Sequence, residues 1–184
     1  MQITGVCCRP LLATAVSQLY GPGCAALMQK AFGFLKQTKV DTLLLAGSWR
    51  SDELAALAET LDWLNHNAIP TILFGPKVQY DAPLPRIMAQ AIERHEPQLP
   101  DRHRPSNFAN LDRDMEALAR AKGVAYVSFF RLLCRDESCD YAVDGHPLTF
   151  DIGHFTRWGS SLVATRLRTS DMGGLAERLS TANE

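Results

Sequence analysis

The sequence predicts an α/β domain with a mostly parallel sheet. Three short apolar runs of strand length alternate with helical segments along its 184 residues. Such alternation is typical of parallel strands connected through helices. The runs span 40–46, 70–76 and 124–127. Because chemistry in open sheets of this kind lies at the carboxyl ends of the strands, we expect a site near residues 47–50, 75–80 or after Val127.

The first half of the chain supplies two helices and two strands. A helix is predicted from about Cys24 to Gln37, where apolar side chains recur at helical spacing. The run at 40–46 ends at Gly47, as expected of a buried strand. Ser51 is the predicted N-cap of the next helix, because acidic residues and a leucine face follow it. The second strand, 70–76, ends in a Gly-Pro break.

The second half begins with a long proline-rich excursion over 76–106, and excursions of this length often carry function. One helix is expected inside it. A later helix begins at Asn107 or Asn110 and leads to the third strand. Thr156 is the expected cap of a final amphipathic helix, which a polar tail follows. The helices predicted in this half span about 84–95, 107–122, 129–133 and 156–168.

Composition excludes several classes of protein. Lys plus Arg (19) nearly cancels Asp plus Glu (20), which gives a net charge of −1. A protein that binds nucleic acid or anionic membranes through its overall charge would show a basic excess, so we expect no nucleic-acid partner. No apolar run approaches the ~20 residues of a membrane span, and we find no secretory signal. The five cysteines nevertheless suit disulfides and an oxidising compartment.

The cysteine spacing favours disulfides over a metal site. Cys134 and Cys139 enclose a loop that one disulfide can close, and Cys8 or its neighbour Cys7 can pair with Cys24. Zinc is the alternative, but structural zinc sites usually need two close pairs of Cys or His. Only one moderately close pair is present, so no metal is expected.

The strongest local pattern is Asp151-Ile152-Gly153-His154, in a turn just ahead of the last predicted helix. An Asp three residues before a His can bind the imidazole Nδ1–H. This contact fixes the tautomer and leaves Nε2 free as a general base toward a serine hydroxyl. The alternative is an Asp-capped turn with an exposed His.

With Thr156 and Gly159, this pattern resembles the last block of the SGNH (GDSL-type) esterase and acetyltransferase superfamily. More narrowly, the chain resembles the extracytoplasmic SGNH domain fused to membrane acyltransferases that O-acetylate surface polysaccharides. The resemblance runs in order from residue 7 to about 168. The segments that carry it are Cys8-Arg9-Pro10 with Cys24, Leu43–Trp49, Ile72–Pro76, Pro83-Leu84-Pro85, Leu133-Cys134 through Cys139, and Asp144–Leu148.

The resemblance implies a three-layer α/β/α, flavodoxin-like domain over residues 1–168, with 169–184 as a polar tail. It implies O-acyl transfer to a carbohydrate, with His154 as the base and Asp151 orienting it. Such chemistry requires no cofactor. The acyl donor would come through a membrane acyltransferase domain, and the location would be periplasmic. The implied disulfides are Cys8–Cys24 and Cys134–Cys139.

The chain departs from the family at the nucleophile, because it contains no Gly-Asp-Ser. We therefore expect an N-terminally incomplete domain whose first strand and serine lie outside this chain. Ser48 follows a strand but occupies the block that supplies substrate or oxyanion contacts. Ser48, Trp49 and Arg50 are thus candidates for substrate binding, Trp49 by stacking on a sugar ring. Packing is the alternative for Trp49, and a solvated helix start is the alternative for Arg50. The alternative functions are an SGNH esterase or deacetylase and a non-catalytic carbohydrate-binding module.

Overall fold

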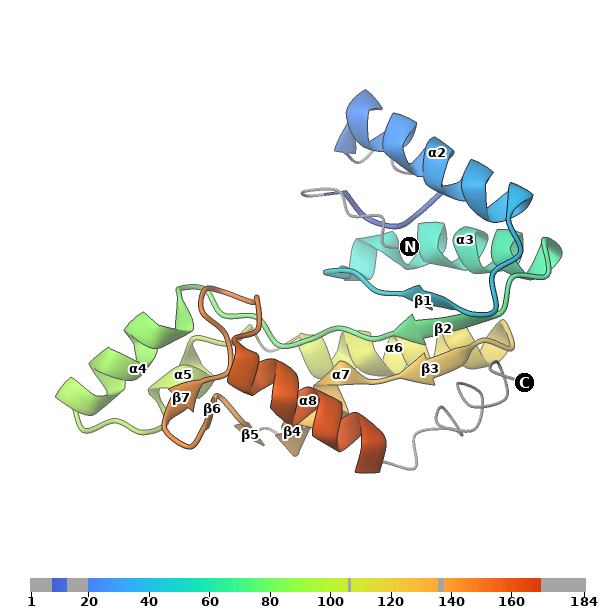
Figure 1. The fold of residues 1–184 in the computed structure, drawn as a ribbon. Coiled ribbons are helices and arrows are strands. Elements are labelled where there is room, and N and C mark those ends of the chain that lie inside the picture. The colour runs from blue at the N-terminus through green and yellow to red at the C-terminus, as the bar shows by residue number, and fades with distance from the viewer. Residues whose placement is uncertain (1–7, 13–19, 106, 136–137, 170–184) are drawn as a thin grey trace. The chain divides into compact units, whose positions relative to one another are not determined.

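Three short strands in parallel register form the predicted sheet in the computed structural model (Figure 1). They are β1 (Leu43–Leu45), β2 (Thr71–Phe74) and β3 (Ala125–Val127), in the order β1-β2-β3. Leu44 pairs with Ile72, and Leu73 pairs with Tyr126. Each strand is shorter than the apolar run that predicted it. The expected α/β class with a parallel sheet is confirmed.

The structure describes residues 8–12, 20–105, 107–135 and 138–169, and these fall into two compact units. The first unit holds the described residues up to 75 together with 113–127, and therefore contains the sheet. The second unit holds 76–112 and the described residues from 128 onward. Cys7 and the expected polar tail after residue 169 lie outside the described residues. Within the described ranges, no helix is both long and apolar enough to cross a bilayer.

The core of the first unit consists of buried apolar side chains from the sheet and from three helices. The helices are α2 (Pro22–Gln37), α3 (Leu54–His66) and the part of α6 (Phe108–Ala121) from residue 113. The Phe32 ring of α2 meets the Trp63 ring of α3 edge-on, with centroids 5.1 Å apart. Leu61 and Leu64 of α3 are fully buried. The leucine face predicted for α3 is therefore its packing face.

The predicted N-cap Ser51 is wrong. A short 3-10 turn, η1 (Ser51–Glu53), precedes α3, and Arg50 occupies the cap position. The Arg50 backbone N–H donates to Glu53 Oε2 at 3.0 Å. Glu53 is only 1% exposed, and its carboxylate also accepts the Tyr20 hydroxyl and lies 3.4 Å from Arg9 Nε. The Glu53 carboxylate, not the Ser51 hydroxyl, therefore organises the start of this helix, and its burial raises the pKa of Glu53.

The second unit is built from short elements. Its helices are α4 (Leu84–Glu93), α5 (Leu99–Arg102), the first turn of α6, α7 (Phe129–Leu133) and α8 (Arg157–Thr169). Its small antiparallel hairpins join β4 (Cys134–Arg135) to β5 (Ser138–Cys139) and β6 (Ala142–Val143) to β7 (His146–Pro147). The proline-rich excursion therefore contains a second helix, α5, that the sequence did not predict. A common apolar cluster includes Leu84, Phe130 and Val163.

Two disulfides tie short segments to these elements. Cys134–Cys139 closes the β4–β5 hairpin, and Cys8–Cys24 joins the N-terminal segment to α2. The second bond uses Cys8, where the spacing alone allowed either Cys7 or Cys8.

Candidate functional site

Asp151 and His154 lie in the loop between β7 and α8, and the structure brings their side chains together. His154 Nδ1–H donates to Asp151 Oδ2 at 2.7 Å. The other carboxylate oxygen, Oδ1, accepts the backbone N–H groups of Gly153 at 2.8 Å and His154 at 2.7 Å. Because Nδ1 carries the proton in this arrangement, Nε2 is the ring nitrogen that can accept one. The His154 side chain is 75% exposed, and its Nε2 forms no hydrogen bond to any of the described residues.

The same contacts keep Asp151 ionised. The backbone N–H of His154, followed by that of Gly153 and the imidazole itself, lowers the pKa of Asp151 from 3.8 to about 2 against the opposing effect of burial. Hydrogen bonds to a carboxylate favour its charged form. The ionised Asp151 can therefore orient the His154 ring and stabilise the imidazolium that forms when Nε2 takes a proton.

Backbone hydrogen bonds close the loop around this pair. Phe150 N–H donates to His154 O at 3.0 Å, and Thr149 forms an antiparallel bridge with Phe155. Thr149 Oγ1 donates to Asp151 O at 3.0 Å. The spacing of Asp151 and His154 is thus held by main-chain contacts on both sides, which preorganises the pair.

The loop is seated on the segment that follows β2. Tyr80 N–H donates to Ile152 O at 2.9 Å, and Leu84 N–H, at the start of α4, donates to Asp151 O at 3.2 Å. The long excursion expected from the sequence therefore supports the Asp151–His154 loop through its first residues.

Lys77 is a residue of this site that sequence reasoning missed. Its Nζ donates to Gly153 O, and the same nitrogen lies 5.1 Å from the centroid of the Phe155 ring. Burial lowers the pKa of Lys77, while the charge of Asp151 acts in the opposite direction. Lys77 is 76 positions from Gly153 in the sequence, so no local spacing links them. Its only signal was its place after the second strand, inside the window 75–80.

The start of α8 fixes the other end of the loop. Thr156 Oγ1 accepts the Gly159 backbone N–H at 3.1 Å, which confirms Thr156 as the cap of the last helix. The Thr156 hydroxyl donates to Pro147 O at 2.8 Å, and its N–H donates to Leu148 O at 2.9 Å. Thr156, two residues after His154, therefore ties the start of α8 to Pro147 and Leu148, which precede the loop.

The expected substrate-binding residues Ser48, Trp49 and Arg50 belong to the first unit and follow β1. Trp49 is 4% exposed, and its indole N–H donates to Phe74 O at 2.7 Å. This position favours packing over stacking on a sugar. Arg50 forms a bidentate pair with Asp52, with both contacts at 3.0 Å or less. Its guanidinium is therefore already engaged at a helix start, whereas Ser48 is partly buried.

Ser128 is a second hydroxyl at the end of a strand, directly after β3. It is completely buried, and its hydroxyl donates to Asp112 Oδ1 at 2.7 Å while its oxygen accepts the Arg131 backbone N–H. These contacts make Ser128 the cap of α7. A hydroxyl with no exposed surface cannot reach a substrate, so these contacts indicate a structural role for Ser128.

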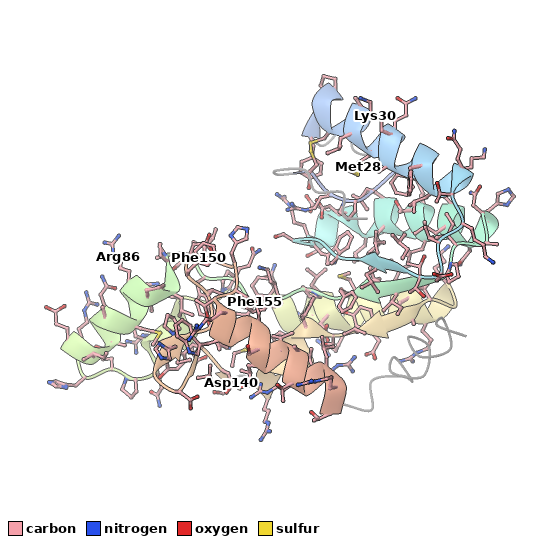
Figure 2. All side chains as sticks on the ribbon, viewed as in Figure 1. Met28, Lys30, Arg86, Asp140, Phe150 and Phe155 are labelled. Atoms are coloured by element: carbon pink, nitrogen blue, oxygen red, sulfur yellow. A yellow bond between two sulfur atoms is a disulfide. The ribbon has the colours of Figure 1, made fainter. Side chains whose placement is uncertain are left out.

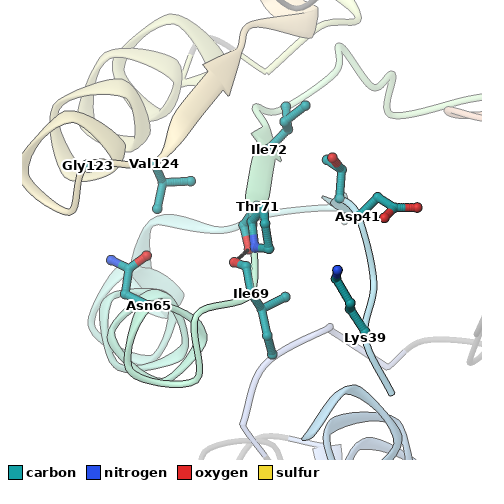
Figure 3. A pocket seen from close by; sticks show the side chains of 10 residues that line it. Lys39, Asp41, Asn65, Ile69, Thr71, Ile72, Gly123 and Val124 are labelled. Atoms are coloured by element: carbon teal, nitrogen blue, oxygen red, sulfur yellow. Dashed lines mark hydrogen bonds between the residues drawn. The ribbon is translucent and has the colours of Figure 1, made fainter. Parts of the chain in front are cut away.

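A cavity of about 530 Å³ lies in the first unit at the amino ends of the strands (Figure 3). It is lined by residues just before β1 and at the start of β2, among them Lys39, Asp41 and Thr71, and by Asn65 and Gly123. Ligands of open α/β sheets bind at the carboxyl ends of the strands, so this cavity lies at the wrong end for that chemistry. In the described part of the chain, no three His, Cys, Asp or Glu residues group as metal ligands would.

Comparisons with known proteins agree with this architecture. The sequence model for "SGNH domain (fused to AT3 domains)" matches residues 1–169. No curated protein sequence matches the chain. Among solved structures, the periplasmic domain of a lipopolysaccharide acetyltransferase from Salmonella ser. Paratyphi A is similar, with a TM-score of 0.68 at 19% identity. The match covers 79% of this chain but only 62% of that chain. At this identity the likeness shows the fold, which is SGNH-like.

Proposed function

The chain belongs to the family of SGNH domains that are fused to AT3 domains, and on that premise we propose that it serves O-acyl transfer to a carbohydrate outside the cytoplasm. Family membership supports an acyltransferase role in general terms. The observation that carries the mechanism is the Asp151–His154 pair, with a 2.7 Å contact at Nδ1 and an exposed Nε2. The partner would be the AT3 acyltransferase domain, and the acceptor a surface polysaccharide.

In the proposed reaction, His154 acts twice as a base. Its Nε2 first takes the proton of a serine hydroxyl while the serine oxygen attacks the acyl donor, and it returns that proton to the donor's leaving group as the serine becomes an ester. Nε2 then takes the proton of a sugar hydroxyl, whose oxygen attacks that ester and receives the acyl group. The serine regains its proton as it leaves. Asp151 stays ionised throughout and holds the imidazole.

The serine of this scheme lies outside the 184 residues. Support comes from the missing Gly-Asp-Ser and from His154, whose hydrogen bonds within the described residues are made to Asp151 and Phe150, neither of them a serine. The β1 strand also pairs on one side only among the described strands, and its Leu44 is exposed. A strand carrying the serine would fit beside β1.

The test compares polysaccharide O-acetylation in cells that produce the protein with its AT3 partner domain. We expect His154→Ala to lower O-acetylation by about 10²–10⁴-fold, the usual contribution of general base catalysis. His66→Ala is the matched control, because His66 is an exposed histidine on α3 in the first unit. Unchanged O-acetylation in the His154→Ala protein would contradict the proposal.

A second measurement separates transfer from hydrolysis and locates the serine. Incubated with an acetyl ester, the 184-residue chain is expected to release no acetate beyond the background of its His154→Ala variant. Turnover that Ser48→Ala abolishes would place the nucleophile inside this chain. In the complete system, acetate release without acetylated glycan would favour the esterase alternative.

A further inference from the structure

Phe150 is an exposed aromatic residue beside the proposed base. Its side chain is 61% exposed, although a phenyl ring gains roughly 1.5–3 kcal/mol from full burial. The exposed large apolar side chains of the described residues are Leu44, Ile92, Phe150 and Ile152. Phe150, labelled in Figure 2, is the aromatic member of that set. Ile152 lies two residues further along the same loop.

The ring of Phe150 is aligned with the imidazole of His154. The two centroids are 5.8 Å apart, and the planes differ by 19°. The Phe150 N–H donates to His154 O, and the neighbouring Thr149 bridges to Phe155. The backbone contacts that position His154 therefore also position Phe150 and its ring. A ligand in contact with this ring would therefore lie close to the proposed base.

The other aromatic residues near the loop already have partners on their faces. The Trp158 ring is stacked on His146 at 3.9 Å and lies 4.5 Å from the Arg157 guanidinium. The Phe155 ring faces Lys77 Nζ. Phe150 is stacked on His154, but its side chain is 61% exposed and so retains ring surface that faces solvent. The stacking role that the sequence suggested for Trp49 is therefore better met by Phe150.

We propose that the pyranose ring of the acceptor sugar stacks on Phe150 and thereby presents a hydroxyl to His154 Nε2. This inference rests on the proposed function and assigns the acceptor, not the acyl chain, to this surface. An acyl chain gains free energy only where it is enclosed, in proportion to the apolar area removed from water. Phe150 and His154 are too exposed to enclose one. A sugar ring can lay its C–H face on an aromatic plane and keep its peripheral hydroxyls hydrated.

The experiment measures binding to the 184-residue chain without turnover. The probes are the methyl pyranosides of glucose, galactose and mannose, because stacking on a ring face does not require one sugar. Binding is followed through the imidazole Hε1 resonance of His154, assigned with His154→Gln, and through saturation transfer from Phe150. We expect the wild-type chain to bind these sugars weakly, with a Kd of roughly 100 mM or lower. A Kd of roughly 100 mM is tenfold below the 1 M standard state.

Three variants isolate the aromatic face. Phe150→Ala and Phe150→Leu are expected to raise the Kd about 2- to 12-fold, the range typical of one aromatic stacking contact, whereas Phe150→Tyr keeps it. Ile92→Ala is the matched control. Ile92 is more exposed than Phe150 and lies eight residues along α4 from Leu84, roughly 12 Å of helix from the loop contact. An unchanged midpoint of thermal unfolding verifies that each variant is folded.

Several results would overturn the proposal. One is the absence of binding for all three pyranosides, and another is a Kd that Phe150→Ala leaves unchanged. Wild-type affinity in Phe150→Leu would show that the surface recognises apolar area, not an aromatic plane. Because binding is measured without an acyl donor, its failure leaves the acetylation test of His154→Ala standing. Failure of that test likewise leaves the sugar-binding result standing.

Discussion

Gly159 offers a sharp test of how α8 is attached beside the proposed site. It is the third residue of α8, and a Cβ placed on it would lie 2.1 Å from Leu148 O and 3.1 Å from Phe155 Cδ1. Leu148 O is a backbone atom that accepts the Thr156 N–H. A methyl group at position 159 therefore cannot be accommodated by turning a side chain, and α8 must move away from Leu148.

The expected magnitude combines three effects. Overpacking against a fixed neighbour costs about 1–3 kcal/mol, and loss of the Thr156–Leu148 hydrogen bond costs about 0.5–1.5 kcal/mol. Replacing a helical glycine by alanine returns about 1 kcal/mol. We therefore expect Gly159→Ala to lower the free energy of unfolding by about 0.5–3.5 kcal/mol. In a chain of this size, the midpoint of thermal unfolding falls by about 2–4 °C for each kcal/mol.

Differential scanning calorimetry measures this change, with Gly33→Ala as the control. Gly33 lies inside α2, and a Cβ there meets nothing within 4 Å. The same substitution should therefore raise the melting temperature by the helix propensity alone. Opposite signs for the two variants support the contact at Leu148. A rise in melting temperature for Gly159→Ala would refute it.

Two further predictions concern the loop itself. Because the pKa of Asp151 is lowered to about 2 from 3.8, its stabilisation is complete above about pH 5 and is lost as the pH falls toward 2. The difference in unfolding free energy between wild type and Asp151→Asn, measured in urea, should therefore shrink from pH 6 to pH 2.5, and a constant difference would contradict this assignment. Lys77→Met removes the donor to Gly153 O and should cost about 1–3 kcal/mol, the usual penalty for a buried polar group left without its partner. Lys77→Arg is the control in the same denaturation assay, and wild-type stability in Lys77→Met would show that the contact is dispensable.

The parts of the site that sequence reasoning predicted are those whose contacts are local. Asp151 and His154 are three residues apart, and Thr156 and Gly159 are also three apart. Turns and caps at such spacing depend on nearby backbone geometry, so the residue types alone indicate them. The helices other than α5 and the three strands of the parallel sheet were predicted for the same reason, since each follows a local apolar pattern.

The parts that it missed depend on contacts between distant segments. Lys77 meets the loop from 76 positions away. The prediction of a Ser51 cap was wrong because Glu53 is buried beside Arg9, which lies 44 positions earlier in the sequence. The Glu53 carboxylate then accepts the Arg50 N–H. The packing of Trp49 depends on Phe74 in the neighbouring strand. Tertiary contacts of this kind override local preference.

In the loop that carries His154, main-chain groups make the hydrogen bonds that fix the backbone, and some side chains are left exposed. Ile152 uses its carbonyl oxygen to accept the Tyr80 N–H, and Phe150 uses its N–H to bind His154 O, while both side chains face solvent. A substitution at 150 or 152 can thus change what the surface recognises without removing a hydrogen bond that positions the base. Only proline at 150 would remove such a donor. If the acceptor sugar stacks on Phe150 as we propose, single substitutions at 150 or 152 would alter the acceptor preference and leave the hydrogen bonds around Asp151 and His154 in place.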